Sequence, residues 1–316
     1  MKEMIVGTFN KIPKKSNSHS YGWARTWSEN TGLAIDFTNT ETLDIAYLLH
    51  GANFGGALNL FGGFTAELEN SINTLLEAKE IISLEIPMPD YGAMLKKRND
   101  VTDKEWCDHV SERLADSKVL VSSNLPFTHL AIGDSHTAAY APEKCSVVKQ
   151  DGTTLFGQIK TDFEYIRSHI KPHHKSLTLS LGNIDIRHHA HRNDADIESM
   201  VDALHAFGQS TGMPVEYAVP WPIEFEGRKL PKTGYYKGTP FSGSIAHRRD
   251  FVRRWIVRMH HNKMQPVHCP MEWYTMDPEQ YAKYYMEARQ SVHLSPEYYR
   301  RTNWGRKGSL DDFFGM

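Results

Sequence analysis

The sequence is most informative when read outward from one segment, Leu130-Ala131-Ile132-Gly133-Asp134-Ser135-His136-Thr137. Its apolar part, residues 128–132, is typical of a short strand buried inside a sheet. Gly133 ends this run, and Asp134 and Ser135 begin a turn. Ligands of α/β proteins bind outside the carboxyl ends of parallel strands, so Ser135 is a candidate nucleophile. Alternatively, Asp134 and Ser135 only cap the segment that follows them.

Downstream of this segment, strand patterns alternate with helix patterns. Strands are predicted over residues 146–149, 176–181, 215–219 and 266–269, and helices over residues 162–170, 195–208, 248–261 and 278–288. Helix 195–208 has the clearest periodicity, because its apolar residues recur on one side and a glycine ends it. This alternation predicts an α/β fold with a flavodoxin-like, doubly wound sheet over residues 127–316.

Residues 1–126 form an N-terminal α/β extension in this interpretation. Strands are predicted over residues 33–37, 45–50 and 81–86, and helices over residues 66–79 and 104–115. The pattern is consistent with a parallel or mixed sheet, and no internal repeat is evident. The glycine-rich segment 51–63 fits neither phosphate-binding fingerprint, so we expect a structural turn there. The alternative is a loop that lines the cleft of the serine or contacts a second substrate.

Bulk composition excludes several classes of protein. The chain has 316 residues, 40% of them hydrophobic, which suits one large domain or one domain with an extension. The formal net charge of -2 argues against a protein that binds nucleic acid mainly by electrostatic attraction. Three widely separated cysteines do not resemble a disulfide framework and favour a reducing compartment. With no apolar run of membrane-spanning length and no secretory leader, we expect no membrane partner and a cytoplasmic location.

Three motifs together resemble the SGNH (GDSL) hydrolase superfamily. Gly133-Asp134-Ser135 is similar to its first motif, and Gly182-Asn183-Ile184-Asp185 is similar to its third, usually Gly-x-Asn-Asp. Ser291-Val292-His293-Leu294-Ser295 resembles the last motif, which carries the catalytic histidine. The order and spacing agree over residues 127–296. The resemblance implies an SGNH-type esterase or O-acyltransferase that uses a serine nucleophile and no cofactor.

The catalytic pair implied by this resemblance is Ser135 and His293. A serine hydroxyl needs an adjacent base to become nucleophilic, and His293 would supply it. His136 is a weaker candidate base, because neighbouring side chains on a turn point apart. The sequence departs from the family three residues before His293, where Gln290 replaces the usual acid. Either a Ser–His dyad suffices, or another acid (Glu287, Asp277) substitutes, or the site binds its ligand without efficient turnover.

An oxyanion hole needs fixed hydrogen-bond donors aimed at the developing negative charge. By resemblance, these donors are the backbone N–H groups of Ser135 and Gly157 and an asparagine side chain. Strict alignment from Gly182 places Ile184 at the asparagine position, and Asn183 lies one residue earlier. A shift by one residue in an extended segment turns a side chain to the other face. We nevertheless predict Asn183, because the turn after a strand need not remain extended.

Further substrate contacts are predicted beside these groups. Asp134 and Asp185 are acidic candidates, and Arg187 or His189 would bind an anionic substrate group. Alternatively, Asp185 and Arg187 form a structural ion pair near the site. The expected substrate is a small-molecule or carbohydrate acyl ester; its identity, the acyl acceptor and the oligomeric state are left open by the sequence.

The remaining patterns allow other functions. The histidine-rich segments 173–174, 188–191 and 260–261 lack the usual spacing of a zinc site, so we expect no metal and solvated polar loops. Helix 248–261 contains five arginines, which form either a solvated face or a surface that contacts nucleic acid. The alternative function is a catalytically weak SGNH-like module that binds carbohydrate or nucleic acid.

Overall fold

The computed structural model describes side chains over residues 127–137, 145–148, 150, 152–220 and 238–267 and at residues 77–78, and only the backbone of β1 to β5 and Lys149. The predicted helices at 66–79, 104–115 and 278–288, the glycine-rich segment 51–63 and the candidate base His293 lie outside the described residues. The chain divides into two compact units, Met1–Leu125 and Pro126–Met316.

The described part of the first unit contains a sheet of five parallel strands. They are β1 (Glu3–Val6), β2 (Ala34–Ile35), β3 (Ile45–Leu48), β4 (Glu80–Ser83) and β5 (Val119–Val121). Their spatial order is β2-β1-β3-β4-β5, and every adjacent pair is parallel. Strands β2, β3 and β4 confirm the three predicted strands, whereas β1 and β5 were not predicted.

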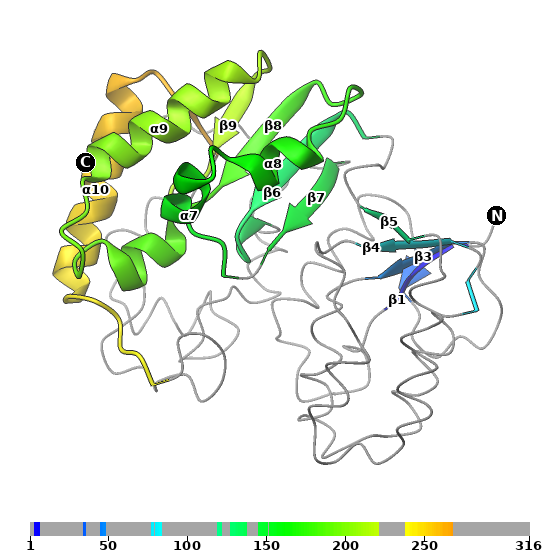
Figure 1. The fold of residues 1–316 in the computed structure, drawn as a ribbon, viewed down its shortest axis with the longest axis horizontal. Coiled ribbons are helices and arrows are strands. Elements are labelled where there is room, and N and C mark those ends of the chain that lie inside the picture. Colours follow the sequence, from blue (N-terminus) through cyan, green and yellow to red (C-terminus); the bar gives the residue numbers. More distant parts are fainter. Residues whose placement is uncertain are drawn as a thin grey trace. The chain divides into compact units, whose positions relative to one another are not determined.

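The second unit also contains a parallel sheet, with helices around it (Figure 1). Its described strands are β6 (His129–Gly133), β7 (Cys145–Lys149), β8 (Ser176–Ser180), β9 (Val215–Tyr217) and β10 (Gln265–Pro266). The spatial order is β10-β9-β8-β6-β7. These strands confirm the five predicted ones to within a few residues, and the unit is an α/β fold.

The two units repeat one plan. Counted from the start of each unit, the strand order is second, first, third, fourth, fifth in both sheets. In each sheet, one residue of the third strand pairs with an apolar residue of the first strand. A glycine lies three positions after that third-strand residue. The pairs are Val6–Leu48, before Gly51, and Ile132–Leu179, before Gly182. Pro-x-Pro also follows each fourth strand, at 87–89 and 220–222. The repeat is therefore visible in strand order, although the sequence alone does not reveal it.

The hydrophobic core of the second unit is centred on β6 and β8. Leu130, Ala131, Ile132, Leu177 and Leu179 have no exposed surface. A parallel strand in the middle of a sheet is covered on both faces, which explains why both sequences are continuous apolar runs rather than alternating ones. This burial fixes where the carboxyl ends of β6 and β8 lie, and therefore where the residues after them meet.

Three helices of the second unit lie within three residues of the predicted ranges 162–170, 195–208 and 248–261, and two further helical segments were not predicted. They are α7 (Leu155–Lys160), α8 (Glu164–His169), the π-helical turn η3 (Asp185–His189), α9 (Ile197–Ser210) and α10 (Ile245–His261). The helix predicted over residues 162–170 is confirmed as α8, and Asp162 and Phe163, whose φ angles are 48° and 56°, separate it from α7, which was not predicted. The ring of Phe163 stacks on Phe207 of α9 at 4.2 Å, and this contact offsets the backbone strain.

Local caps explain the boundaries of the two long helices. The side chain of Asp196 accepts from the Ser199 backbone N–H at 3.1 Å and begins α9. Ser244 begins α10 in the same way, accepting from the His247 N–H at 3.3 Å. Such side chains satisfy amides that have no partner within the helix.

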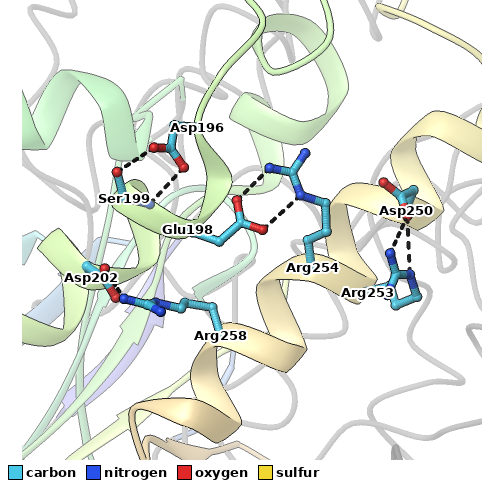
Figure 2. Close-up of polar contacts among 8 residues, drawn as sticks. All are labelled: Asp196, Glu198, Ser199, Asp202, Asp250, Arg253, Arg254 and Arg258. Carbon is cyan, nitrogen blue, oxygen red and sulfur yellow. Dashed lines mark hydrogen bonds and ion pairs between the residues drawn. The ribbon is translucent and has the colours of Figure 1, made fainter.

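Helices α9 and α10 pack side by side and are joined by ion pairs (Figures 1 and 2). Arg254 donates to both carboxylate oxygens of Glu198, at 2.9 and 2.5 Å. Arg258 pairs with Asp202 in the same forked geometry, at 2.6 and 2.5 Å. The interaction between α9 and α10 therefore neutralises two of the five arginines that were considered for nucleic-acid binding.

The other arginines of α10 include one with a structural role. Arg248 is fully buried and donates to the carbonyl oxygen of Gly243 at 2.7 Å. Arg253 pairs with Asp250 on the same helix, at 2.8 Å (Figure 2). Among the described helices, none is both long enough and apolar enough to serve as a membrane span.

Candidate functional site

The candidate site lies where the strand order of the second sheet reverses. β6 is flanked by β7 on one side and β8 on the other, and Gly133 at the end of β6 pairs with Ser180 at the end of β8. In open parallel sheets, ligands bind outside the carboxyl ends of the strands at such a point. The turns at residues 134–137 and 181–184 follow these two strands, and they contain the residues of the first and third sequence motifs.

A buried hydrogen bond joins the two motifs. The Nδ2 of Asn183 donates to Oδ2 of Asp134 at 2.9 Å, and the backbone N–H of His136 donates to Oδ1 of the same carboxylate, also at 2.9 Å. Neither Asp134 nor Asn183 has exposed surface. Asn183, rather than Ile184, is thus the residue of the third motif that contacts the Gly-Asp-Ser turn.

Ser135 lies on a turn that hydrogen bonds hold at both of its ends. The Asp134 N–H donates to the carbonyl oxygen of Ser180 at 2.9 Å, which ties the start of the turn to β8. The Thr137 hydroxyl donates to the carbonyl oxygen of Asp134 at 2.7 Å, which closes the turn. Ser135 is 7% exposed, so its position is well defined and its surface is small.

Arg187 contacts the residue next to the serine. Its Nη1 lies 3.1 Å from Nε2 of His136, and both side chains are buried. A guanidinium can only donate, so Nε2 accepts and the imidazole proton is on Nδ1. His136 therefore uses its Nε2 lone pair to accept from Arg187, which agrees with its place as the weaker candidate base. No sequence pattern predicted this pairing between residues 51 positions apart.

Asp185 lies close to Asn183 in sequence but contacts a different element. Its carboxylate accepts from the backbone N–H groups of Leu155 at 2.7 Å and Phe156 at 3.1 Å. These amides are in the first turn of α7, where helical N–H groups have no partner within the helix. In this structure Asp185 therefore holds α7 to η3. Its predicted contact with substrate stays a prediction.

The π-helical turn η3 explains why adjacent predicted residues separate. The Ala190 N–H donates to the carbonyl oxygen of Asp185 at 2.8 Å, a spacing of five residues. This wider turn directs Asp185 toward α7, Arg187 toward His136 and His189 toward a surface pocket. Single π-helical turns often occur at functional sites.

Gly157 lies in α7 and has a partner there. Its N–H donates to Oγ1 of Thr154 at 3.0 Å, the bond that caps α7. A role as an oxyanion donor would require this bond to be exchanged for one to substrate. The assignment stays a prediction.

Two pockets border these elements among the described residues. One, of about 400 Å³, is lined mainly by apolar groups of α7, η3 and α9 and includes Asp185 and His189. The other, of about 590 Å³, is lined by polar side chains between residues 150 and 168, and Gly157 is part of its wall. Ser135 is part of neither lining. The structure therefore brings Asp134, Ser135 and Asn183 together and places His189 and Gly157 at two separate pockets.

The predicted solvation of the histidine-rich segments is wrong for two residues. His174 and His188 are each only 4% exposed. His188 packs against Phe241 with ring centroids 5.1 Å apart, so it contributes to the core. Among the described residues, no group of three histidine, cysteine or acidic side chains is arranged to hold a metal ion.

Burial changes the pKa of Asp134, so the stability of the fold depends on pH. Desolvation raises its pKa from 3.8 to about 6, although the bonds from Asn183 and His136 and the charge of Arg187 oppose the rise. Because the folded state holds this proton more tightly than the unfolded state, Asp134 stabilises the fold below pH 4. That contribution, on the order of 2–3 kcal/mol, is lost as the pH rises through 6.

We expect Asp134→Asn to flatten this pH dependence. The difference in unfolding temperature between pH 4.5 and pH 7 should be smaller in this variant than in the wild type, as measured by calorimetry. Asp194→Asn, at an exposed position, is the matched control and should retain the wild-type profile. An unchanged profile in Asp134→Asn would show that Asp134 is ionised at both pH values.

Comparison of the chain with protein-family models, with curated proteins and with solved structures finds no match.

Proposed function

We propose that the protein is a serine-dependent, SGNH-type esterase or O-acyltransferase acting on acyl esters. The observation that carries the proposal is the buried bond from Asn183 Nδ2 to Asp134 Oδ2. It holds the asparagine of the third motif beside the turn that bears Ser135, which supports a position for the amide near the proposed oxyanion hole. The strand order second-first-third-fourth-fifth supports the proposal, because it is the flavodoxin-like order.

In the proposed reaction, the Ser135 hydroxyl oxygen attacks the ester carbonyl while His293 removes its proton. The carbonyl oxygen becomes negatively charged, and the Ser135 N–H and the Asn183 amide donate hydrogen bonds to it. The tetrahedral intermediate then collapses, the C–O bond to the leaving alcohol breaks, and the alcohol takes the proton from His293. Water or a second hydroxyl group then gives its proton to His293 and attacks the acyl-serine. The acyl C–O bond to Ser135 breaks, and the serine oxygen takes the proton back from His293.

The test is to label the wild-type protein with a fluorophosphonate probe and to identify the labelled peptide by mass spectrometry. We expect one label per chain, on the peptide that contains Ser135, with a labelling rate that rises with pH as the histidine base deprotonates. Labelling at another serine, or no labelling of folded protein at any pH, would reject the proposal.

A second candidate function is a binding module without efficient turnover. Two observations favour it: Ser135 is only 7% exposed, and Gln290 occupies the position of the usual triad acid. Carbohydrate is the better ligand class for such a module, because Arg254 and Arg258 already pair with acidic residues of α9. An unlabelled protein that binds glycans would support this second candidate.

A further inference from the structure

We propose that the polar pocket between the β7–α7 loop and α8 binds a carbohydrate. The pocket has a volume of about 590 Å³ and is open to solvent on one side. The inference extends the proposed function by naming the substrate class, and it rests on that function only in treating the bound glycan as a substrate.

The lining itself excludes two ligand classes. Its described residues are threonine, glutamine, glycine, serine, glutamate and tyrosine, and among them there is no aliphatic side chain to receive an acyl chain. Lysine and arginine are also absent from the described lining, so no cation is available to bind a phosphate or carboxylate. A neutral, strongly hydrated ligand fits such a wall best.

The hydrogen bonds within the wall define the ligand further. The hydroxyl of Thr153 donates to Oε1 of Gln150 at 2.9 Å, and that of Ser168 donates to the carbonyl oxygen of Tyr165 at 2.7 Å. The Thr161 hydroxyl donates in the same way to a carbonyl oxygen of α7, at 3.3 Å. Because these protons are used inside the protein, the hydroxyl oxygens face a ligand as acceptors.

Two more acceptors belong to the same wall. Glu164 contributes an exposed carboxylate. Gln158 is only 8% exposed, and no group among the described residues donates a hydrogen bond to its Oε1. A buried acceptor without a partner costs about 1–3 kcal/mol, so its presence in the fold requires a reason. We infer that a hydroxyl of the ligand supplies the missing donor.

A wall rich in acceptors requires a ligand rich in hydroxyl donors. A sugar ring has that chemistry, and the apolar face of the ring can pack on an aromatic side chain such as Tyr165, which is half-buried in the wall. Gly157 is part of the same wall. The bound sugar would therefore lie against the segment that the sequence resemblance associates with the oxyanion hole.

The test measures binding of the full-length protein to an array of immobilised oligosaccharides. We expect binding to at least one glycan, and Gln158→Leu should weaken that binding by about tenfold or more. The unfolding temperature of Gln158→Leu should equal or exceed that of the wild type, because leucine removes an unsatisfied polar atom. Gln209→Leu, on the exposed side of α9, is the matched control and should bind as the wild type does.

A second variant tests the same pocket even if Gln158→Leu does not fold. Glu164 is exposed, so Glu164→Gln leaves the fold intact and should also weaken glycan binding. Absence of binding to every glycan, or wild-type binding by both variants, would overturn the inference. Wild-type protein that binds a glycan but carries no fluorophosphonate label on Ser135 would reject the proposed function and leave this inference standing.

Discussion

Replacing Ser135 with alanine is expected to lower the rate of ester cleavage by a factor on the order of 10⁴ or more. Removal of the hydroxyl removes the atom that forms the acyl intermediate, and the remaining oxyanion donors supply only a small residual rate. The measurement is kcat/KM for p-nitrophenyl acetate, together with the unfolding temperature of each variant. Little change in stability is expected, because the substitution deletes one oxygen at a position that is 7% exposed.

The matched control for this variant is Ser210→Ala. Ser210 lies in the last turn of α9, where its hydroxyl donates to the carbonyl oxygen of Phe207 at 2.7 Å. Its loss removes one serine hydroxyl from the second unit and leaves the candidate site untouched. Equal rates for Ser135→Ala and the wild type would contradict serine catalysis and favour the binding module.

Replacing Gly133 with alanine is expected to destabilise the second unit by about 3 kcal/mol or more. A Cβ at this position would lie 2.6 Å from the carbonyl carbon of Ser180 and even closer to its oxygen. That oxygen also accepts from the Asp134 N–H at 2.9 Å, so it cannot move away without breaking the bond that anchors the turn. Overpacking against backbone in a buried sheet has no low-energy relief.

The comparison variant is Gly212→Ala. Gly212 has a φ of 68°, but a Cβ there would contact nothing within 4 Å. Alanine at Gly212 should therefore cost only the backbone strain, roughly 1 kcal/mol. Both values come from chemical denaturation monitored by circular dichroism. A loss for Gly133→Ala no larger than for Gly212→Ala would show that β6 and β8 are less closely paired than the structure indicates.

The predictions that succeeded depend on local patterns. The apolar runs at β6 and β8 identified buried parallel strands, and the periodicity of residues 197–208 identified α9. Helix α7 was not predicted, and its separation from α8 is stabilised by the contact of Phe163 with Phe207, 44 positions later in the chain. A stacking partner at that distance leaves no trace in a local sequence window.

Only some residues of the candidate site could be predicted from the sequence. Resemblance identified Asp134, Ser135 and Asn183 as site residues, and the structure brings them together. The same resemblance could not separate Asp185, which holds α7, from its neighbour Arg187, which holds His136. Consecutive residues of one motif point in different directions because η3 is a π-helical turn.

Hydrophobic periodicity and turn residues therefore established the strands, the long helices and the α/β class, because each of these depends on neighbours along the chain. Only the folded molecule shows the strand order and the repeat of one plan in both units. The same holds for the contact of Asn183 with Asp134 and for the acceptor-rich pocket. Strand order and the contact of Asn183 depend on segments that are distant in the chain, such as Asp134 and Asn183, 49 positions apart. The pocket depends on how residues 150–168 fold against one another. No local pattern determines which of many equally apolar strands become neighbours; the packing of the whole sheet does.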